Sequence, residues 1–244
     1  MKDKANGQVY IIGAGPGDPE YLTLKAYKRI KEAEVVLYDD LIDDRILDLV
    51  PPKAERIYVG RRHGSKTNQS LRHELIQNTF ANHLSKGKVI VRLKSGDPLI
   101  FSRTAEEIEC LLDLEIPFEI IPGISAGFAA ATILKLPLTK RMKARALIIS
   151  LGHTSDENMR HITDICPLIS NGNPLMLYMA RIKLQNIIDI MIQNQVPSST
   201  KVFACANVSL FNEVYIEGDM TNIVKKIEKV EPGIPFVFIF CKEL

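Results

Sequence analysis

Four short loops contain residues that could bind a small ligand, and each follows an apolar run. The first, GAGPGDP at residues 13–19, follows the run at residues 9–12. Its glycines suggest the dinucleotide-binding pattern G-x-G-x-x-G, but Asp18 takes the place of the third glycine and Pro16 lacks an N–H for phosphate. A tight turn that lets an uncharged ligand approach the backbone, or a turn with a structural role alone, suits this loop better.

The other three loops offer small or polar residues at the ends of predicted strands. In KSGDP, at residues 94–98, Gly96 permits close approach of a ligand and Asp97 can accept hydrogen bonds from a ribose or an amine. PGISAG, at residues 122–127, begins a helix of small residues that leaves room for a ligand or for close helix packing. The LYMAR loop places Met179 at a strand end, as a ligand contact or as a core residue.

Arginine and lysine are gathered in two clusters, which suit either a solvated face or a polyanionic substrate. The clusters are Arg61, Arg62, His63 and Lys66, and Lys140, Arg141, Lys143 and Arg145. Arginine pairs with carboxylates in a forked geometry, which favours a carboxylate-rich ligand. Arg103 stands apart after an apolar loop, and this isolation suggests a specific anionic partner or a part in catalysis.

Short β-branched runs that alternate with helix-period segments must position these loops, and they predict an α/β protein. Strands are predicted at residues 9–12, 35–38, 89–93, 118–121, 146–151, 175–178, 202–206, 214–216 and 235–241. Helices are predicted at residues 22–33, 71–84, 104–112 and 183–194. The close spacing of strands near the end predicts antiparallel pairing there. The seam between two halves is expected at residues 117–122.

The composition fits an ordinary globular protein with no bias toward nucleic acid. The chain has 244 residues, 25% of them charged, and a net charge of +2. Its four cysteines form no CxxC pair, which predicts buried thiols in a reducing compartment and no metal site. We expect neither a signal peptide nor a membrane span, so a cytoplasmic protein fits. HExxH and P-loop patterns are absent, which argues against metalloprotease and kinase chemistry.

Taken together, the loops resemble the tetrapyrrole methyltransferases, in order and spacing, from about residue 8 to residue 218. Within that family they are most similar to the branch that methylates uroporphyrinogen III. The matching stretches are VYIIGAGPGDP at 9–19, LTLKA at 22–26, VVLYDDL at 35–41, YVGRR at 58–62, VRLKSGDP at 91–98, IPGIS at 121–125, LPLTKR at 136–141, GH at 152–153 and YM at 178–179. Each stretch alone is a weak signal, and together they are highly specific.

The resemblance implies two α/β domains with a ligand cleft between them, the tetrapyrrole methylase fold and not a Rossmann fold, usually in a homodimer. Residues 1–118 would form an N-terminal domain with substrate-side loops, and residues 119–244 a C-terminal domain that completes the cofactor cleft. The cofactor would be S-adenosyl-L-methionine, with no metal, no nucleic acid and no membrane partner. By motif position its contacts would be Pro16, Ser95, Gly96, Asp97, Ser125, Ala126, Met179 and Val208.

The implied reaction is methylation of uroporphyrinogen III at C2 and C7 to give precorrin-2, which feeds sirohaem and corrinoid synthesis. Arg103 matches a family arginine proposed to assist catalysis, and Asp39, Arg61 and Arg141 would contact the tetrapyrrole. Because an arginine side chain stays protonated in proteins, we expect Arg103 to anchor a carboxylate and stabilise charge rather than act as a base.

Departures from the family pattern keep other interpretations open. Where the family usually has glycine, this chain has Ser95, Ser102, Thr104, Ala105 and, after the YM pair, Ala180. A C-methyltransferase that acts on a later corrin precursor such as cobalt-precorrin-4 is one alternative. A catalytically silent protein that binds S-adenosylmethionine or a tetrapyrrole is another. A methylase of diphthamide precursor or ribosomal RNA and a flavin or nicotinamide oxidoreductase are further alternatives.

Overall fold

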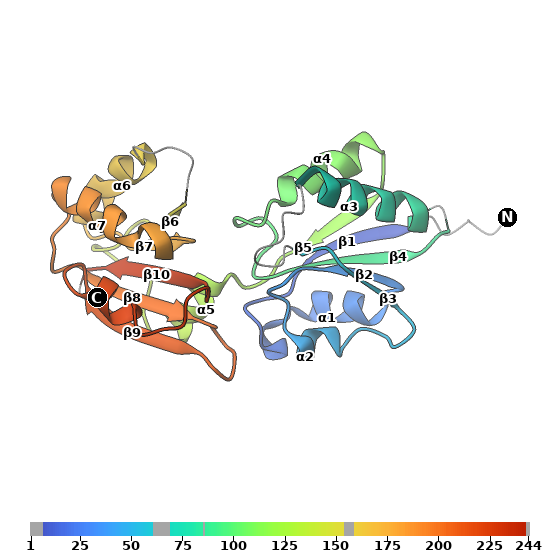
Figure 1. Cartoon of the computed structure of the whole chain (residues 1–244), viewed down its shortest axis with the longest axis horizontal. Helices are drawn as coiled ribbons and strands as arrows, with labels where there is room; N and C mark the ends of the chain where they lie inside the picture. Colours follow the sequence, from blue (N-terminus) through green and yellow to red (C-terminus); the bar gives the residue numbers. More distant parts are fainter. Residues whose placement is uncertain (1–6, 61–68, 85, 154–158, 243–244) are drawn as a thin grey trace. The chain divides into compact units, whose positions relative to one another are not determined.

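The computed structural model describes residues 7–60, 69–84, 86–153 and 159–242, and the side chains of residues 69–74 are not described. The chain divides into two compact units, Met1–Ser125 and Ala126–Leu244. Each unit is built on its own five-stranded sheet (Figure 1). The expected pair of α/β domains is therefore confirmed.

The first sheet is parallel throughout, with the order β3-β2-β4-β1-β5. Its strands are β1 (Gln8–Gly13), β2 (Val35–Tyr38), β3 (Glu55–Tyr58), β4 (Val89–Lys94) and β5 (Phe118–Ile121). Parallel strands covered on both faces appear in sequence as nearly continuous apolar runs, which explains the clear sequence signal of β1 and β2.

Helices cover both faces of this sheet, as Figure 1 shows. On one face Ile12 of β1 shares a core with Ala26 and Ile30 of α1 (Leu24–Lys31), and α2 (Asp44–Leu47) joins them. On the other face Ile11 packs with Phe80 of α3 (Gln69–Leu84) and Leu111 of α4 (Thr104–Asp113). Neighbouring residues of β1 thus enter different cores, because side chains alternate along a strand.

The second sheet is mixed, with the order β6-β7-β10-β8-β9. It contains β6 (Ile148–Leu151), β7 (Leu175–Tyr178), β8 (Lys201–Ala206), β9 (Val214–Asp219) and β10 (Phe236–Cys241). β6 and β7 are parallel, whereas β10 is antiparallel to β7 and β8, and β8 is antiparallel to β9. The predicted antiparallel pairing near the end of the chain is confirmed.

The core of the second unit lies between this sheet and three helices. Leu175 and Leu177 of β7 face α6 (Arg160–Ser170), α7 (Leu184–Gln193) and α8 (Ile223–Ile227). α5 (Ala126–Ile133) lies on the opposite face, where Gly127 approaches Met176 and Tyr178 of β7. Two short 3-10 helices, η1 (Pro19–Tyr21) and η2 (Arg181–Lys183), follow β1 and β7.

The first unit extends to Ser125, beyond the expected domain end at residue 118, because β5 pairs with β1 in the first sheet. All four cysteines are buried free thiols, and burial raises the pKa of Cys205 to about 12 and that of Cys241 to about 11. Within the described ranges, no helix has the length and apolar character needed to cross a membrane.

Candidate active site

Two of the candidate loops are joined by their backbones at the carboxyl edge of the first sheet. Gly15 and Gly96 exchange N–H···O bonds of 2.7 and 3.2 Å, and Ala14 N donates to Lys94 O at 2.8 Å. Gly96 has a φ of +70°, a left-handed conformation that favours glycine. The loops after β1 and β4 therefore form one continuous backbone surface.

The loop after β5 joins this surface by close approach. A Cβ on Gly123 would overlap the Gly96 carbonyl oxygen and would lie 2.7 Å from Gly13 Cα. Asp97 Oδ2 accepts a hydrogen bond from Gly123 N at 3.1 Å, and Asp97 Oδ1 accepts one from Leu99 N at 2.8 Å. The Asp97 carboxylate thus connects two loops, a role that its sequence position did not reveal.

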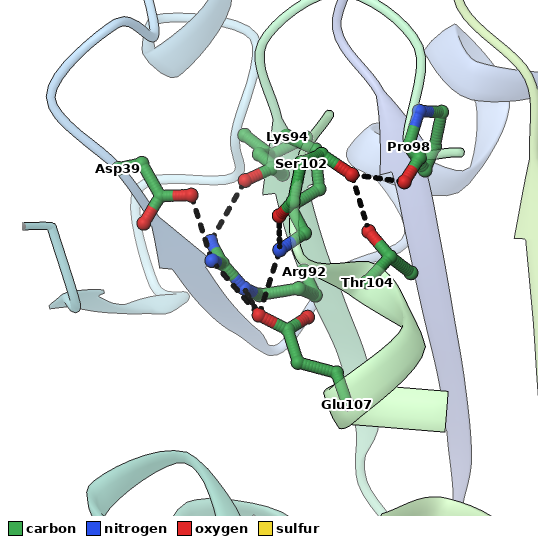
Figure 2. Close-up of polar contacts among 8 residues, drawn as sticks. Asp39, Arg92, Lys94, Pro98, Ser102, Thr104 and Glu107 are labelled. Atoms are coloured by element: carbon green, nitrogen blue, oxygen red, sulfur yellow. Dashed lines mark hydrogen bonds and ion pairs between the residues drawn. The ribbon is translucent and has the colours of Figure 1, made fainter. Parts of the chain in front are cut away.

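A cluster of buried charges lies directly behind the loop that follows β4 (Figure 2). Arg92 and Lys94, two residues apart on β4, point to the face covered by α4. Arg92 Nη2 pairs with Asp39 Oδ2 at 2.7 Å and with Glu107 Oε1 at 3.2 Å. Lys94 Nζ pairs with the same Glu107 oxygen at 2.7 Å. Two cations and two carboxylates balance one another in this cluster.

The positive charges of the cluster keep the Glu107 carboxylate ionised. Burial alone would raise the pKa of Glu107, but Arg92 and Lys94 outweigh it and hold that pKa below the ordinary value. Burial, followed by the charge of Arg92, lowers the pKa of Lys94. Because an unpaired buried charge is strongly destabilising, each of these groups depends on the others.

The loop between Asp97 and α4 carries Arg103 and is held from behind. Lys94 Nζ donates to the Ser102 carbonyl at 2.9 Å, and the Ser102 and Thr104 hydroxyl oxygens lie 2.7 Å apart (Figure 2). The Ser102 hydroxyl also donates to the Pro98 carbonyl. Arg103 itself is exposed, has a φ of +57° and makes no side-chain capping bond to α4. Its guanidinium is therefore available to an anionic ligand.

In the second unit, candidate residues lie at the carboxyl edge of the sheet. β6, β7 and β8 run in one direction, so the loops that follow them leave from the same edge. Met179 follows β7 with a φ of +53° and is 58% exposed, which excludes a core role and suits a ligand contact. Val208 follows β8 and is buried between the left-handed residues Asn207 and Ser209.

The small residues at the start of α5 serve packing in the second unit. Tyr178 Oη accepts a hydrogen bond from Gly127 N at 3.0 Å, and a Cβ on Gly127 would lie 2.6 Å from that oxygen. Of the two interpretations of this segment, close packing of a helix on β7 is therefore realised at Gly127.

The candidate residues fall into separate groups. Pro16, Ser95, Gly96, Asp97 and Ser125 belong to the first unit, whereas Ala126, Met179 and Val208 belong to the second. Asp39 lies in the buried charge cluster, with its side chain 22% exposed. Arg61, with Arg62, His63 and Lys66, lies outside the described residues.

The structure does not bring Arg141 to the edge that carries Met179. Arg141 lies in a turn closed by backbone bonds between Lys140 and Ala144. The end of that turn is fixed by Asn173 Oδ1, which accepts hydrogen bonds from Arg145 N and Ala146 N just before β7 begins. Arg141 therefore lies toward the amino-terminal edge of the second sheet, and Met179 lies at the carboxyl edge.

These arrangements agree with the comparisons to known proteins. The profile of the family described as Tetrapyrrole (Corrin/Porphyrin) Methylases matches residues 8–224. The chain belongs to this family.

Named relatives fall within the same family. The chain is 36% identical over 234 residues to a uroporphyrinogen-III C-methyltransferase of Methanocaldococcus jannaschii, covering 96% of this chain and 95% of that protein. A structure of uroporphyrin-III C-methyl transferase from Thermus thermophilus, complexed with S-adenyl homocysteine, matches with a TM-score of 0.80, 31% identity and coverage of 96% and 97%. A cobalt precorrin-4 methyltransferase matches with a TM-score of 0.86, 22% identity and coverage of 99% and 97%, which shows the shared fold alone. The chain spans about half the length of the siroheme synthases that it matches.

Proposed function

We propose that this chain transfers methyl groups from S-adenosyl-L-methionine to C2 and C7 of uroporphyrinogen III, which gives precorrin-2. The observation that carries the proposal is its 36% identity, over nearly the full length of both chains, to a uroporphyrinogen-III C-methyltransferase. The bound S-adenyl homocysteine in the similar Thermus thermophilus structure supports the choice of methyl donor.

The residues present suit that donor. The joined loops of the first unit offer main-chain polar groups and small side chains, and Pro16 makes them a poor phosphate site. We assign donor contacts to Pro16, Ser95, Gly96, Asp97 and Ser125. In the second unit, we assign them to Ala126, Met179 and Val208. When bound, the donor supplies an electrophilic methyl group on a sulfonium.

The contribution of the chain to the reaction is to place the reacting carbon and neutralise the substrate. Holding two reactants at near-attack distance can supply about 7–11 kcal/mol of the barrier. Arg103 is exposed beside the joined loops and would pair with a substrate carboxylate, thereby fixing the macrocycle. Transfer of the methyl group from the sulfonium leaves a positive charge on the macrocycle, and loss of a proton to water removes that charge. A protonated arginine nearby favours the loss of the proton by repulsion but does not accept it.

The proposed tetrapyrrole contacts differ in how directly they can act. Asp39 is ion-paired with Arg92. We therefore propose that Asp39 helps to hold the buried charge cluster together and also contacts the ligand. Arg61 and Arg141 are proposed as carboxylate partners because of their charge and motif position. By resemblance to the family, we also propose a homodimer that works in the cytoplasm.

A second candidate is methylation of a later corrin precursor such as cobalt-precorrin-4. The Ser95-Gly96-Asp97-Pro98 sequence favours this candidate. The family usually has glycine at position 95, and a Ser-Gly-Asp-Pro loop resembles related methyltransferases that act on corrin rings. Competition between uroporphyrinogen III and cobalt-precorrin-4 for label from S-adenosyl-[methyl-¹⁴C]methionine separates the two. Label on uroporphyrinogen III alone supports the proposal, and label on cobalt-precorrin-4 alone overturns it. Binding of the donor with no label on either acceptor indicates the catalytically silent homologue.

A further inference from the structure

We propose that Lys94 is a positioning residue that fixes the loop presenting Arg103, an inference that rests on the proposed methyltransferase function. Lys94 is 2% exposed, so it cannot touch a substrate. Its ammonium group lies under the loop and contacts it through a main-chain carbonyl (Figure 2). Its effect on catalysis must therefore pass through the loop.

The contacts of Lys94 link three elements. It is the last residue of β4, its Nζ donates to Glu107 Oε1 in the first turn of α4 at 2.7 Å, and it donates to Ser102 O at 2.9 Å. A single ammonium group thus ties the strand, the loop and the helix together. A charged donor makes stronger hydrogen bonds than a neutral one, especially when buried.

The loop needs such support because its backbone is unfavourable. Phe101 and Arg103 have φ values of +51° and +57°, a region that side chains other than glycine rarely adopt. Such conformations persist only where the surrounding structure holds them. The carbonyl of Ser102 lies between these two residues, so the bond from Lys94 acts on the backbone between the two unfavourable conformations.

Arg92 provides a natural comparison within the same cluster. It shares Glu107 with Lys94, but its remaining bonds go to Asp39 and to Leu93 O and none of them reaches the loop. Balancing the charge of Glu107 and holding the loop are therefore separable roles. Of these two residues, only Lys94 both balances the charge of Glu107 and bonds to the loop.

The test uses two variants that differ in charge balance. Lys94→Met removes the bond to the loop and leaves the cluster with one excess negative charge. Lys94→Met/Glu107→Gln removes the same bond and restores the balance, so its thermal stability should recover toward that of the wild type. If Lys94→Met alone folds poorly, the double variant is used for the test in its place. Lys86→Met, at an exposed lysine ahead of the same strand, is the control and should behave as wild type.

Two readouts are measured on the intact protein. We expect hydrogen–deuterium exchange to become faster in residues 99–104 of the double variant and to stay unchanged in α1. We expect kcat for methylation of uroporphyrinogen III to fall about 100-fold, as for a misplaced reacting group. The affinity for S-adenosylhomocysteine, measured by calorimetry, should change much less than kcat.

The outcomes separate this inference from the proposed function. Unchanged exchange in residues 99–104 overturns the positioning role, and so does a double variant that regains kcat together with stability. If the wild-type protein does not methylate uroporphyrinogen III, the proposed function fails. The exchange experiment then still decides whether Lys94 holds the loop, because it needs no substrate.

Discussion

Asp97 Oδ2 accepts a hydrogen bond from Gly123 N at 3.1 Å, which ties the loop after β4 to the loop after β5. The second oxygen of the same carboxylate accepts from Leu99 N and shapes its own loop. Asp97 therefore organises the surface formed by the joined loops, and any direct contact with a ligand would be added to that role.

Replacing Asp97 should weaken cofactor binding. Asp97→Ala leaves two backbone N–H groups without their acceptors, so the loops separate, and we expect about a tenfold rise in the Kd for S-adenosylhomocysteine. Asp97→Asn keeps one acceptor oxygen and should lose less. Asp113→Ala, at an exposed residue of α4, is the control. If calorimetry gives the same Kd for Asp97→Ala and wild type, the cofactor does not bind beside this loop.

Gly123 should tolerate no side chain. A methyl group there would overlap the Gly96 carbonyl and crowd Gly13, so the loops would have to shift. We expect Gly123→Ala to lower the free energy of unfolding by about 1–3 kcal/mol, as other overpacked substitutions do. Urea denaturation measures this directly. A wild-type midpoint would contradict the close approach of the three loops.

Arg103 should matter for turnover and not for cofactor affinity. Its exposed guanidinium lies on the loop that Lys94 holds, and its charge would act on the substrate. Arg103→Ala should lower kcat by about 10²–10³-fold, the range seen when one stabilising donor is removed. The Kd of Arg103→Ala for S-adenosylhomocysteine should change much less than its kcat. Lys53→Ala, at an exposed cation, is the control, and unchanged kcat in Arg103→Ala would exclude this residue from the mechanism.

The hydroxyl group of Ser102 should stabilise the protein. It bonds to the Pro98 carbonyl and pairs with Thr104 Oγ1. We expect Ser102→Ala to lower the free energy of unfolding by about 1 kcal/mol, and Ser102→Gly to lower it further by adding backbone freedom. Thr139→Ala, at an exposed position, should change it by less than about 0.5 kcal/mol. Greater stability of Ser102→Gly than of wild type would contradict this role.

Glu107 should make the protein sensitive to acid. Its pKa in the folded protein lies below the ordinary 4.5. The unfolded chain therefore takes up a proton first as the pH falls, and stability that is fully present above about pH 4.5 is lost toward the folded-state pKa. The difference in the free energy of unfolding between wild type and Glu107→Gln should shrink as the pH falls from about 4.5 to about 3. A constant difference over that range would mean that Glu107 is not held ionised by Arg92 and Lys94.

Much of the fold follows from local sequence patterns. The sequence predicts the bounds of β2, β5 and β7 to the residue. β2 and β7 are short apolar runs, as buried strands usually are. α2, β3, α6 and α8 were not predicted. α2 and α8 are only four and five residues long, and β3 has two exposed residues, so none of these three produces a clear period. α6 has 11 residues, but it contains Pro167, a residue type that ordinarily interrupts a helix.

The buried charge cluster was the main feature of the site that the sequence analysis missed. Arg92 and Lys94 alternate with apolar residues in β4, and two cations on one face of a buried strand indicate that partners must exist. Their partners could not be named from the pattern. Asp39 lies 53 residues away in sequence from Arg92 and comes together with it only in the folded sheet.

Mass analysis of the tetrapyrrole product tests the central claim most directly. The purified protein is incubated without air with uroporphyrinogen III and S-adenosyl-[methyl-¹³C]methionine, and the product is examined by mass spectrometry and carbon NMR. The account predicts a product that carries two labelled methyl groups, at C2 and C7. An unmodified macrocycle, or label at other ring positions, would contradict it.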